Sequence, residues 1–288
     1  MIGSSVKNNL KVILRDPATL LAVLAAVIME FMCGINMGYQ DLYGNELGKE
    51  FYLTEGAYER ILNTMVNLVA NPIANIVFVF MGVVLAVNVF KDIRTQTYDV
   101  MTASGMGFGK YYLAKIISYY ILALGLSFGL TMLHEILFVI FCLPANPNFD
   151  VAKVLIANFV MMVALYTSEL SLSFLFALFW ISLTGVPVVG VLFNAVYAYI
   201  PSMFGLSLTV YTWYLHVTPE VMYWYFKYWI TYPPEQWFSA RLLCGNSVTN
   251  FLWADIYQVG ISCGALILLS VILAVLSYFL LKRRFQKS

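Results

Sequence analysis

Charged side chains are scarce in this sequence. Asp, Glu, Lys and Arg make up 11% of its 288 residues, whereas a soluble globular domain carries about 25%. Hydrophobic residues make up 61% of the chain and the mean hydropathy is +0.81. Several charge-poor runs reach the roughly 20 residues that cross the hydrocarbon core of a bilayer. The low charge therefore argues against a soluble domain and predicts an all-α membrane protein with several spans.

Groupings of residues that would bind a metal or catalyse a reaction are also missing. His134-Glu135 lacks the second histidine of an HExxH zinc site, and the chain's other histidine is His216. The four cysteines show no CxxC or metal-ligand spacing: Cys33, Cys142, Cys244 and Cys263. We expect them to be buried as small apolar side chains, with a disulfide near the outer face as the alternative. We therefore predict no metal site and no enzymatic activity of the chain by itself.

A glycine-rich segment resembles a phosphate loop but has the wrong spacing. A Walker A motif needs four residues between its glycines and Ser or Thr after the lysine. Here three residues separate Gly105 from Gly109, and Tyr111 follows Lys110. The segment is therefore interpreted as a turn, and no nucleotide site is predicted on this chain.

The apolar runs define six predicted spans in a single transmembrane domain over residues 1–288. Their ranges are 18–37, 72–90, 112–143, 151–182, 184–210 and 255–281. The first run is full length and lacks a small-residue cleavage site, so no signal peptide is predicted. Residues 39–70 are polar with a short amphipathic stretch, and 211–250 are aromatic and interrupted by proline. We expect re-entrant or interfacial helices in 211–250, because aromatic side chains favour the headgroup level.

Residues 1–16 alternate in polarity with helical spacing. Apolar Ile2, Val6, Leu10 and Ile13 fall on one face, and Lys7, Lys11 and Arg15 fall on the other. This pattern predicts an interfacial helix whose basic face meets anionic headgroups.

The positions of the basic residues predict the orientation. With six spans and both termini inside, eleven basic residues face the cytosol: Lys7, Lys11, Arg15, Lys91, Arg94, Lys110, Lys115, Lys282, Arg283, Arg284 and Lys287. Five face outward: Lys49, Arg60, Lys153, Lys227 and Arg241. The chain is therefore predicted to be a multi-pass cell-membrane protein whose connection over 91–111 is cytosolic.

The connection over 91–111 carries signals for a short helix of its own. Thr95 or Thr97 can cap its start, Asp99 suits its first turn, and Gly105 can end it. A short helix held at both ends by spans would be stiff enough to transmit a displacement. The alternative is a solvated loop that obeys the positive-inside rule.

The interfacial helix, six spans, cytosolic connection and outer aromatic segment together resemble the permease subunit of ABC-2-type ATP-binding-cassette transporters. The family motif begins with an acid, which is Asp92 here, and ends with a lysine that opens the third span, which is Lys115. Between them Thr97, Asp99 and Met101 stand at the threonine, second acidic and apolar positions. The sequence departs from the motif where Gln96 replaces a glycine and Ser104-Gly105 replaces a proline-containing turn.

The resemblance implies that the connection docks in a groove of a separate cytosolic ATPase. The implied coupling residues are Asp92, Thr97, Tyr98, Asp99, Met101, Ser104 and Lys115. ATP and Mg²⁺ would bind to that partner, so no cofactor is expected on this chain. A second permease copy, as a homodimer, and membrane lipids are the other implied partners, and no nucleic acid is expected.

Two acidic residues lie inside predicted spans. Glu30 and Glu169 either line a substrate route or form hydrogen bonds between helices, since a charge in the bilayer needs a partner or a cavity. Glu135 lies near the outer end of its span and is expected to be ordinary. The resemblance implies export of amphipathic peptides of the bacteriocin, lantibiotic or phenol-soluble-modulin type. The alternatives are export of lipid, drug or polysaccharide, or a membrane anchor or enzyme without an ATPase.

Overall fold

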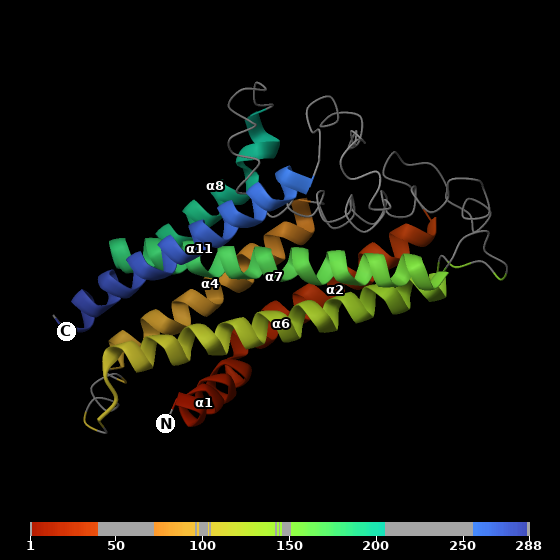
Figure 1. Cartoon of the computed structure of the whole chain (residues 1–288). Coiled ribbons are helices and arrows are strands. Elements are labelled where there is room, and N and C mark those ends of the chain that lie inside the picture. Colours follow the sequence, from red (N-terminus) through yellow and green to blue (C-terminus); the bar gives the residue numbers. More distant parts are fainter. Residues whose placement is uncertain are drawn as a thin grey trace.

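The computed structural model describes residues 2–39, 72–95, 97, 103, 105–141, 143, 145, 151–204 and 256–286. Within these ranges the chain forms seven α-helices and no strand, which confirms the all-helical class (Figure 1). The helices are α1 (Ile2–Arg15), α2 (Pro17–Tyr39), α4 (Pro72–Arg94), α6 (Phe108–Phe141), α7 (Val151–Thr184), α8 (Pro187–Phe204) and α11 (Ile256–Phe285). The predicted helices within 39–70 and 211–250 lie outside the described residues.

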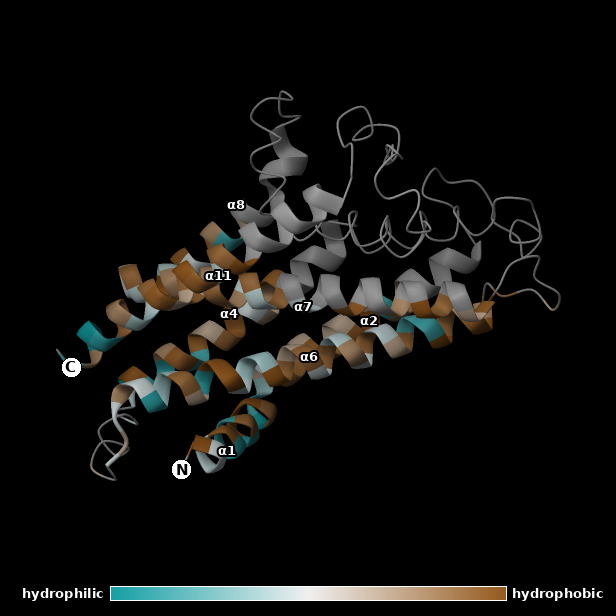
Figure 2. Ribbon diagram, in the orientation of Figure 1, coloured by the Kyte–Doolittle hydropathy of each residue, from teal (hydrophilic) through white to brown (hydrophobic). Residues whose placement is uncertain are grey.

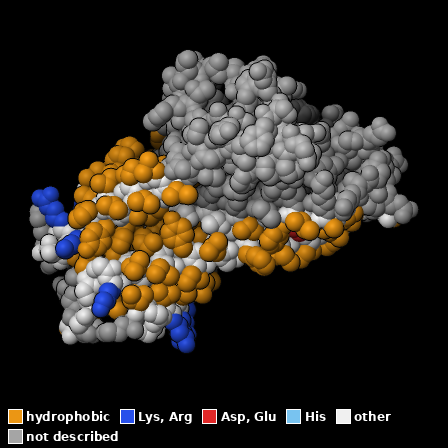
Figure 3. Space-filling model, in the orientation of Figure 1, with side chains coloured by type: hydrophobic (Ala, Val, Ile, Leu, Met, Phe, Trp, Pro, Cys, Tyr) orange, Lys and Arg blue, Asp and Glu red, His pale blue; other side chains and the backbone are white. Residues whose placement is uncertain are grey.

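Helix α7 is the centre of the packing. It contacts α4, α6, α8 and α11, while α2 packs against α4 and α6, and α1 packs against α6 and α2. The N-terminus, the C-terminus and the connection from α4 to α6 lie at one end of the bundle (Figure 1). We call this end the basic end, because Lys and Arg side chains gather there and hydrophobic side chains cover most of the other described surface in that view (Figure 3).

A helix occurs over each of the six predicted spans, but their crossing of a membrane stays a prediction. Among the described residues, α6 alone is long and apolar enough to be a candidate span by itself. A second candidate arises if α1 and Pro17–Met32, which meet at a bend of 69°, are counted together. Apolar residues run along most of α6 and along the coloured part of α11, and polar residues occur at the basic end and at the far end of α6 (Figure 2).

The N-terminal amphipathic helix is confirmed as α1, but its apolar face packs on protein. Val6 is 9% exposed and Ile13 is 1% exposed, and α1 lies against α6. The basic side chains of α1 remain exposed. Asp16 separates α1 from α2, and Pro17 is the first residue of α2, the position where its missing N–H costs no helical hydrogen bond.

Two helix boundaries differ from the predicted ones around the connection. Helix α4 continues to Arg94, and α6 begins at Phe108, so both enter the range that the sequence assigned to a loop. Lys91 and Arg94 lie in the last turn of α4, where cations interact favourably with the helix dipole. Asp92 lies in the same turn and has a cationic partner on α6, so the charged sequence does not end the helix there.

The crossing of α4, α7 and α8 depends on small and polar side chains. The Asn194 amide on α8 donates to the backbone carbonyl of Ser173 at 3.1 Å and to its hydroxyl at 2.7 Å. The Ser173 hydroxyl donates to the carbonyl of Val79 on α4 at 3.2 Å. A Cβ atom added at Gly82 would lie 2.6 Å from the backbone carbonyl carbon of Ser173. Glycine at 82 therefore permits the close approach of α4 to α7.

We expect Gly82→Ala to lower the free energy of unfolding by about 1 kcal/mol, because the added methyl group overlaps the backbone of α7. Thermal unfolding of the purified protein in detergent measures the change. The matched control is Gly125→Ala on α6, where an added Cβ meets nothing within 4 Å. Alanine there should be neutral or stabilising, since glycine is the poorer helix former. Equal effects of the two substitutions would contradict the close approach at Gly82.

Candidate functional site

A buried ion pair connects the end of α4 to the beginning of α6. The Lys115 ammonium lies 2.5 Å from Oδ2 of Asp92, and the two side chains are 6% and 15% exposed. The Tyr111 hydroxyl donates to the same carboxylate oxygen at 2.8 Å. Tyr111 and Lys115 are four residues apart on α6, so both point from one face of the helix. The carboxylate of Asp92 thus has two partners on α6.

This ion pair lies at the two ends of the connection between α4 and α6. Removing one member of a buried pair leaves a charge without compensation, so the pair strongly disfavours separation of the two helices. A displacement applied to the connection would therefore move the ends of α4 and α6 together. Asp92 and Lys115 are largely buried, so they act as positioning residues and leave contact with a partner to other residues.

The first turns of α6 also pack against the end of α11. The ring of Phe285 lies 5.5 Å from that of Phe108 and 5.6 Å from that of Tyr111, measured between ring centroids. The Tyr112 hydroxyl donates to the carbonyl of Ala274 on α11 at 2.7 Å. The beginning of α6 therefore has partners on both α4 and α11.

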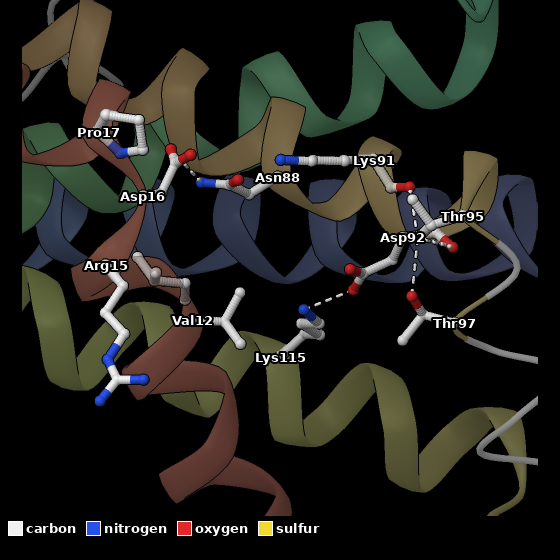
Figure 4. Close-up of a pocket in the computed structure, with 11 residues that line it drawn as sticks. Val12, Arg15, Asp16, Pro17, Asn88, Lys91, Asp92, Thr95, Thr97 and Lys115 are labelled. Carbon is white, nitrogen blue, oxygen red and sulfur yellow. Dashed lines mark hydrogen bonds and ion pairs between the residues drawn. The ribbon is translucent and has the colours of Figure 1, made fainter.

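A cavity of about 460 Å³ lies beside the ion pair, between α1, α2, α4 and α6. Its lining residues are Val12, Ile13, Arg15, Asp16, Pro17, Asn88, Lys91, Asp92, Thr95, Thr97 and Lys115 (Figure 4). Oδ2 of Asp16 accepts hydrogen bonds from Thr19 at 3.3 Å and from Asn88 at 3.4 Å. The bond from Asn88 connects α4 to the residue that precedes α2, and both residues line the cavity.

The structure describes three of the seven predicted coupling residues, Asp92, Thr97 and Lys115. Asp92 and Lys115 form the ion pair, and the Thr97 hydroxyl lies 2.8 Å from that of Thr95 just beyond α4. The Thr95 hydroxyl donates to the Lys91 carbonyl at 3.1 Å, so it bonds to the end of α4. The other predicted coupling residues lie outside the described residues: Tyr98, Asp99, Met101 and Ser104.

Gly105 has a φ of +82° and precedes α6. Glycine adopts this left-handed conformation without the steric cost that a Cβ would bring, which agrees with a turn at this position.

The first of the two acids predicted within spans is buried against another helix. Oε2 of Glu30 on α2 lies 3.0 Å from Nδ1 of His134 on α6. Glu30 is 6% exposed and His134 is fully buried. This contact supports the role of Glu30 in joining helices, and a role in a substrate route stays a prediction.

Of the other two acidic residues in predicted spans, the structure describes the side chain of Glu135 but not that of Glu169. Glu169 lies in α7, but its side chain is outside the described part of the structure. Glu135 is 9% exposed, so it is more buried than its expected place at the interface suggested.

Three contacting residues were not identified from the sequence: Tyr111, Asn194 and Arg284. Tyr111 could have been placed from its spacing of four residues to Lys115. Arg284 on α11 donates to the carbonyls of Ser182 at 2.6 Å and Leu183 at 2.9 Å. These are among the last carbonyls of α7, which lack partners within their own helix. Nothing local in the sequence signals that contact.

A scan against protein-family models finds no match for this chain, and a search of curated proteins finds none either. Among the described residues, no group of three or more His, Cys, Asp or Glu side chains is placed to hold a metal ion.

Proposed function

We propose that this chain is the transmembrane subunit of an ATP-driven exporter of the ABC-2 type. The observation that supports this most is the buried pair of Asp92 and Lys115, which joins α4 and α6 where their connection begins and ends. A connection fixed in this way can transmit movement from a second protein to the helix bundle. Together with the motif resemblance, this favours a coupling element over a passive loop.

In the proposed mechanism ATP binds to a separate subunit. Closure of the two ATPase subunits displaces the connection through Thr97, Tyr98, Asp99, Met101 and Ser104. The ion pair then makes the ends of α4 and α6 move as a unit. Because α6 also contacts α1, α2 and α7, this movement changes their packing and so the access to a route between two permease copies.

The proposal includes the membrane orientation. The gathering of basic side chains at one end supports six spans with both termini in the cytosol, since basic residues are retained on that side (Figure 3). The chain would then be a multi-pass protein of the cell membrane that works as a homodimer.

The proposed cargo is an amphipathic peptide of the antimicrobial type. Glu30 and Glu169 suit the cationic residues of such peptides if their carboxylates become accessible during transport. Lipid, drug and polysaccharide export are the alternatives, and a membrane anchor or enzyme without an ATPase is the alternative from another class.

Substituting Asp99 and Met101 with alanine tests the coupling role. We expect the double variant to lose both co-purification with the ATPase and transport-coupled ATP hydrolysis. The control is Ile140→Ala, near the other end of α6, where the side chain is 57% exposed. Unchanged assembly and hydrolysis in the double variant would refute docking through this connection. The absence of an ATPase that co-purifies with the unmodified chain would favour the anchor.

Stimulation of ATP hydrolysis in the reconstituted complex tests the cargo. We expect amphipathic cationic peptides to stimulate hydrolysis more than added lipids do. A flat response to peptides would remove peptide export while leaving the coupling role intact.

A further inference from the structure

The cavity between α1, α2, α4 and α6 has the lining of a binding site for a phosphate group. We propose that it binds the phosphodiester headgroup of a membrane phospholipid. This inference rests on the proposed membrane location of the chain and on the cavity, but it does not depend on an ATPase partner.

The cavity lining carries an excess of positive charge. Three basic residues and two acidic residues line it: Arg15, Lys91, Lys115, Asp16 and Asp92. The lining thus carries one excess positive charge, the difference between three and two. Lys115 is already paired with Asp92, so the uncompensated charge belongs to Arg15 and Lys91. A phosphodiester carries one negative charge and matches this excess.

The basic groups at the cavity, Arg15 and Lys91, suit the oxygens of a phosphate group. A guanidinium group binds phosphate oxygens through two parallel N–H donors, and a lysine ammonium adds a point charge. Thr95 and Thr97 also line the cavity and bring two hydroxyl groups 2.8 Å apart. The Thr95 hydroxyl donates to the Lys91 carbonyl and the Thr97 hydroxyl to that of Thr95, so the Thr97 oxygen can accept a hydrogen bond from a polyol headgroup.

The position of the cavity in the fold also suits a membrane lipid. The cavity lies where α1 and α2 meet at 69°, so that a helix with a basic face joins a long apolar helix. The basic side chains of α1 are exposed, and exposed basic groups are attracted to anionic headgroups. Val12 lines the cavity and is 62% exposed, and Leu21 on α2 is 65% exposed. Val12, which lines the cavity, offers an apolar surface for an acyl chain beside the site for the headgroup (Figure 4).

The volume agrees with a headgroup. About 460 Å³ falls within the 300–1,000 Å³ that is usual for small-molecule sites. Free inorganic phosphate shares the charge chemistry of the lipid. Arg15 and Lys91 are exposed, however, and attraction between exposed charges is screened by salt. Acyl chains that bind alongside provide the additional affinity, so the lipid is the favoured ligand.

Native mass spectrometry of the delipidated full-length protein in detergent tests the proposal. The probes are dioleoyl phosphatidylglycerol, dioleoylglycerol with the same acyl chains, and inorganic phosphate. We expect phosphatidylglycerol to bind, and the double variant Arg15→Gln/Lys91→Gln to bind it more than about tenfold more weakly, because each substitution removes a charge-assisted hydrogen bond to the phosphate group. Both substituted residues are exposed, so the variant should fold, and its thermal unfolding verifies this.

The matched control is Lys7→Gln/Lys11→Gln, which removes two exposed lysines of α1 that do not line the cavity. Its phosphatidylglycerol affinity should change less than threefold. An equal loss in both double variants would show general surface attraction and overturn the site. Equal binding of dioleoylglycerol would remove the phosphate as the recognised group. Displacement of the lipid by inorganic phosphate at equal concentration would remove the lipid as the ligand.

Discussion

Lys115→Met should lower the free energy of unfolding by about 3 kcal/mol, because it removes the cation from a buried pair and leaves the Asp92 carboxylate behind. The pair joins atoms 2.5 Å apart, and the Lys115 side chain is 6% exposed. Methionine preserves the length and apolar character of the lysine stem, so the loss reports the charge. The Tyr111 hydroxyl would remain as a donor to Asp92 and keeps the loss at the lower end of the range for such pairs.

Thermal unfolding in detergent measures this loss, and two further variants isolate its cause. Lys110→Met removes an exposed lysine one turn earlier on the same helix and should change stability little. The double variant Asp92→Asn/Lys115→Met should be more stable than Lys115→Met, because no unpaired charge remains. If Lys110→Met and Lys115→Met shift the unfolding temperature equally, the buried pair does not stabilise the fold as described.

His134→Leu should lower the free energy of unfolding by about 2–3 kcal/mol, because it removes the contact of Glu30 with His134 at 3.0 Å in a buried site. His134→Asn should retain more of the stability, since its amide N–H can take the place of the Nδ1 donor. Glu30→Leu combined with His134→Leu should also be more stable than His134→Leu alone, because both polar partners are then gone.

Unfolding measurements on these three variants decide whether the contact between α2 and α6 is structural. A loss in His134→Asn as large as in His134→Leu would show that the hydrogen bond is not what stabilises the contact. No recovery in the double variant would show that Glu30 is not the group left unsatisfied. That result would favour the alternative role of Glu30, as a residue that lines the substrate route.

Most of the helices could be predicted from the sequence because the signals for them are local. Apolar runs, the break at Asp16-Pro17 and the alternation in residues 1–16 each depend on neighbours within a few turns. Boundaries near the connection were less accurate, because α4 continues through Asp92 only where α6 supplies a cation. Local polarity predicted a loop there, and a contact across 23 residues extends the helix.

The partners within the site could not be predicted in the same way. Glu30 was expected either to line a route or to join helices, but its contact with His134 spans 104 residues. The bond from Asn194 to Ser173 and the closeness of Gly82 to α7 depend on how three helices cross. No spacing within one segment encodes such a crossing. Tyr111 is the exception, since its distance of four residues from Lys115 already placed both on one face.

The contact of Arg284 with the end of α7 has a consequence for how the protein is made. The carbonyls of Ser182 and Leu183 receive their donors from a residue about one hundred positions later. The ribosome therefore synthesises α7 and the turn at Gly185 about one hundred residues before Arg284. During that interval water or lipid headgroups must solvate the end of α7. The last carbonyls of α7 receive these donors only after α11 has been synthesised and has packed against α7.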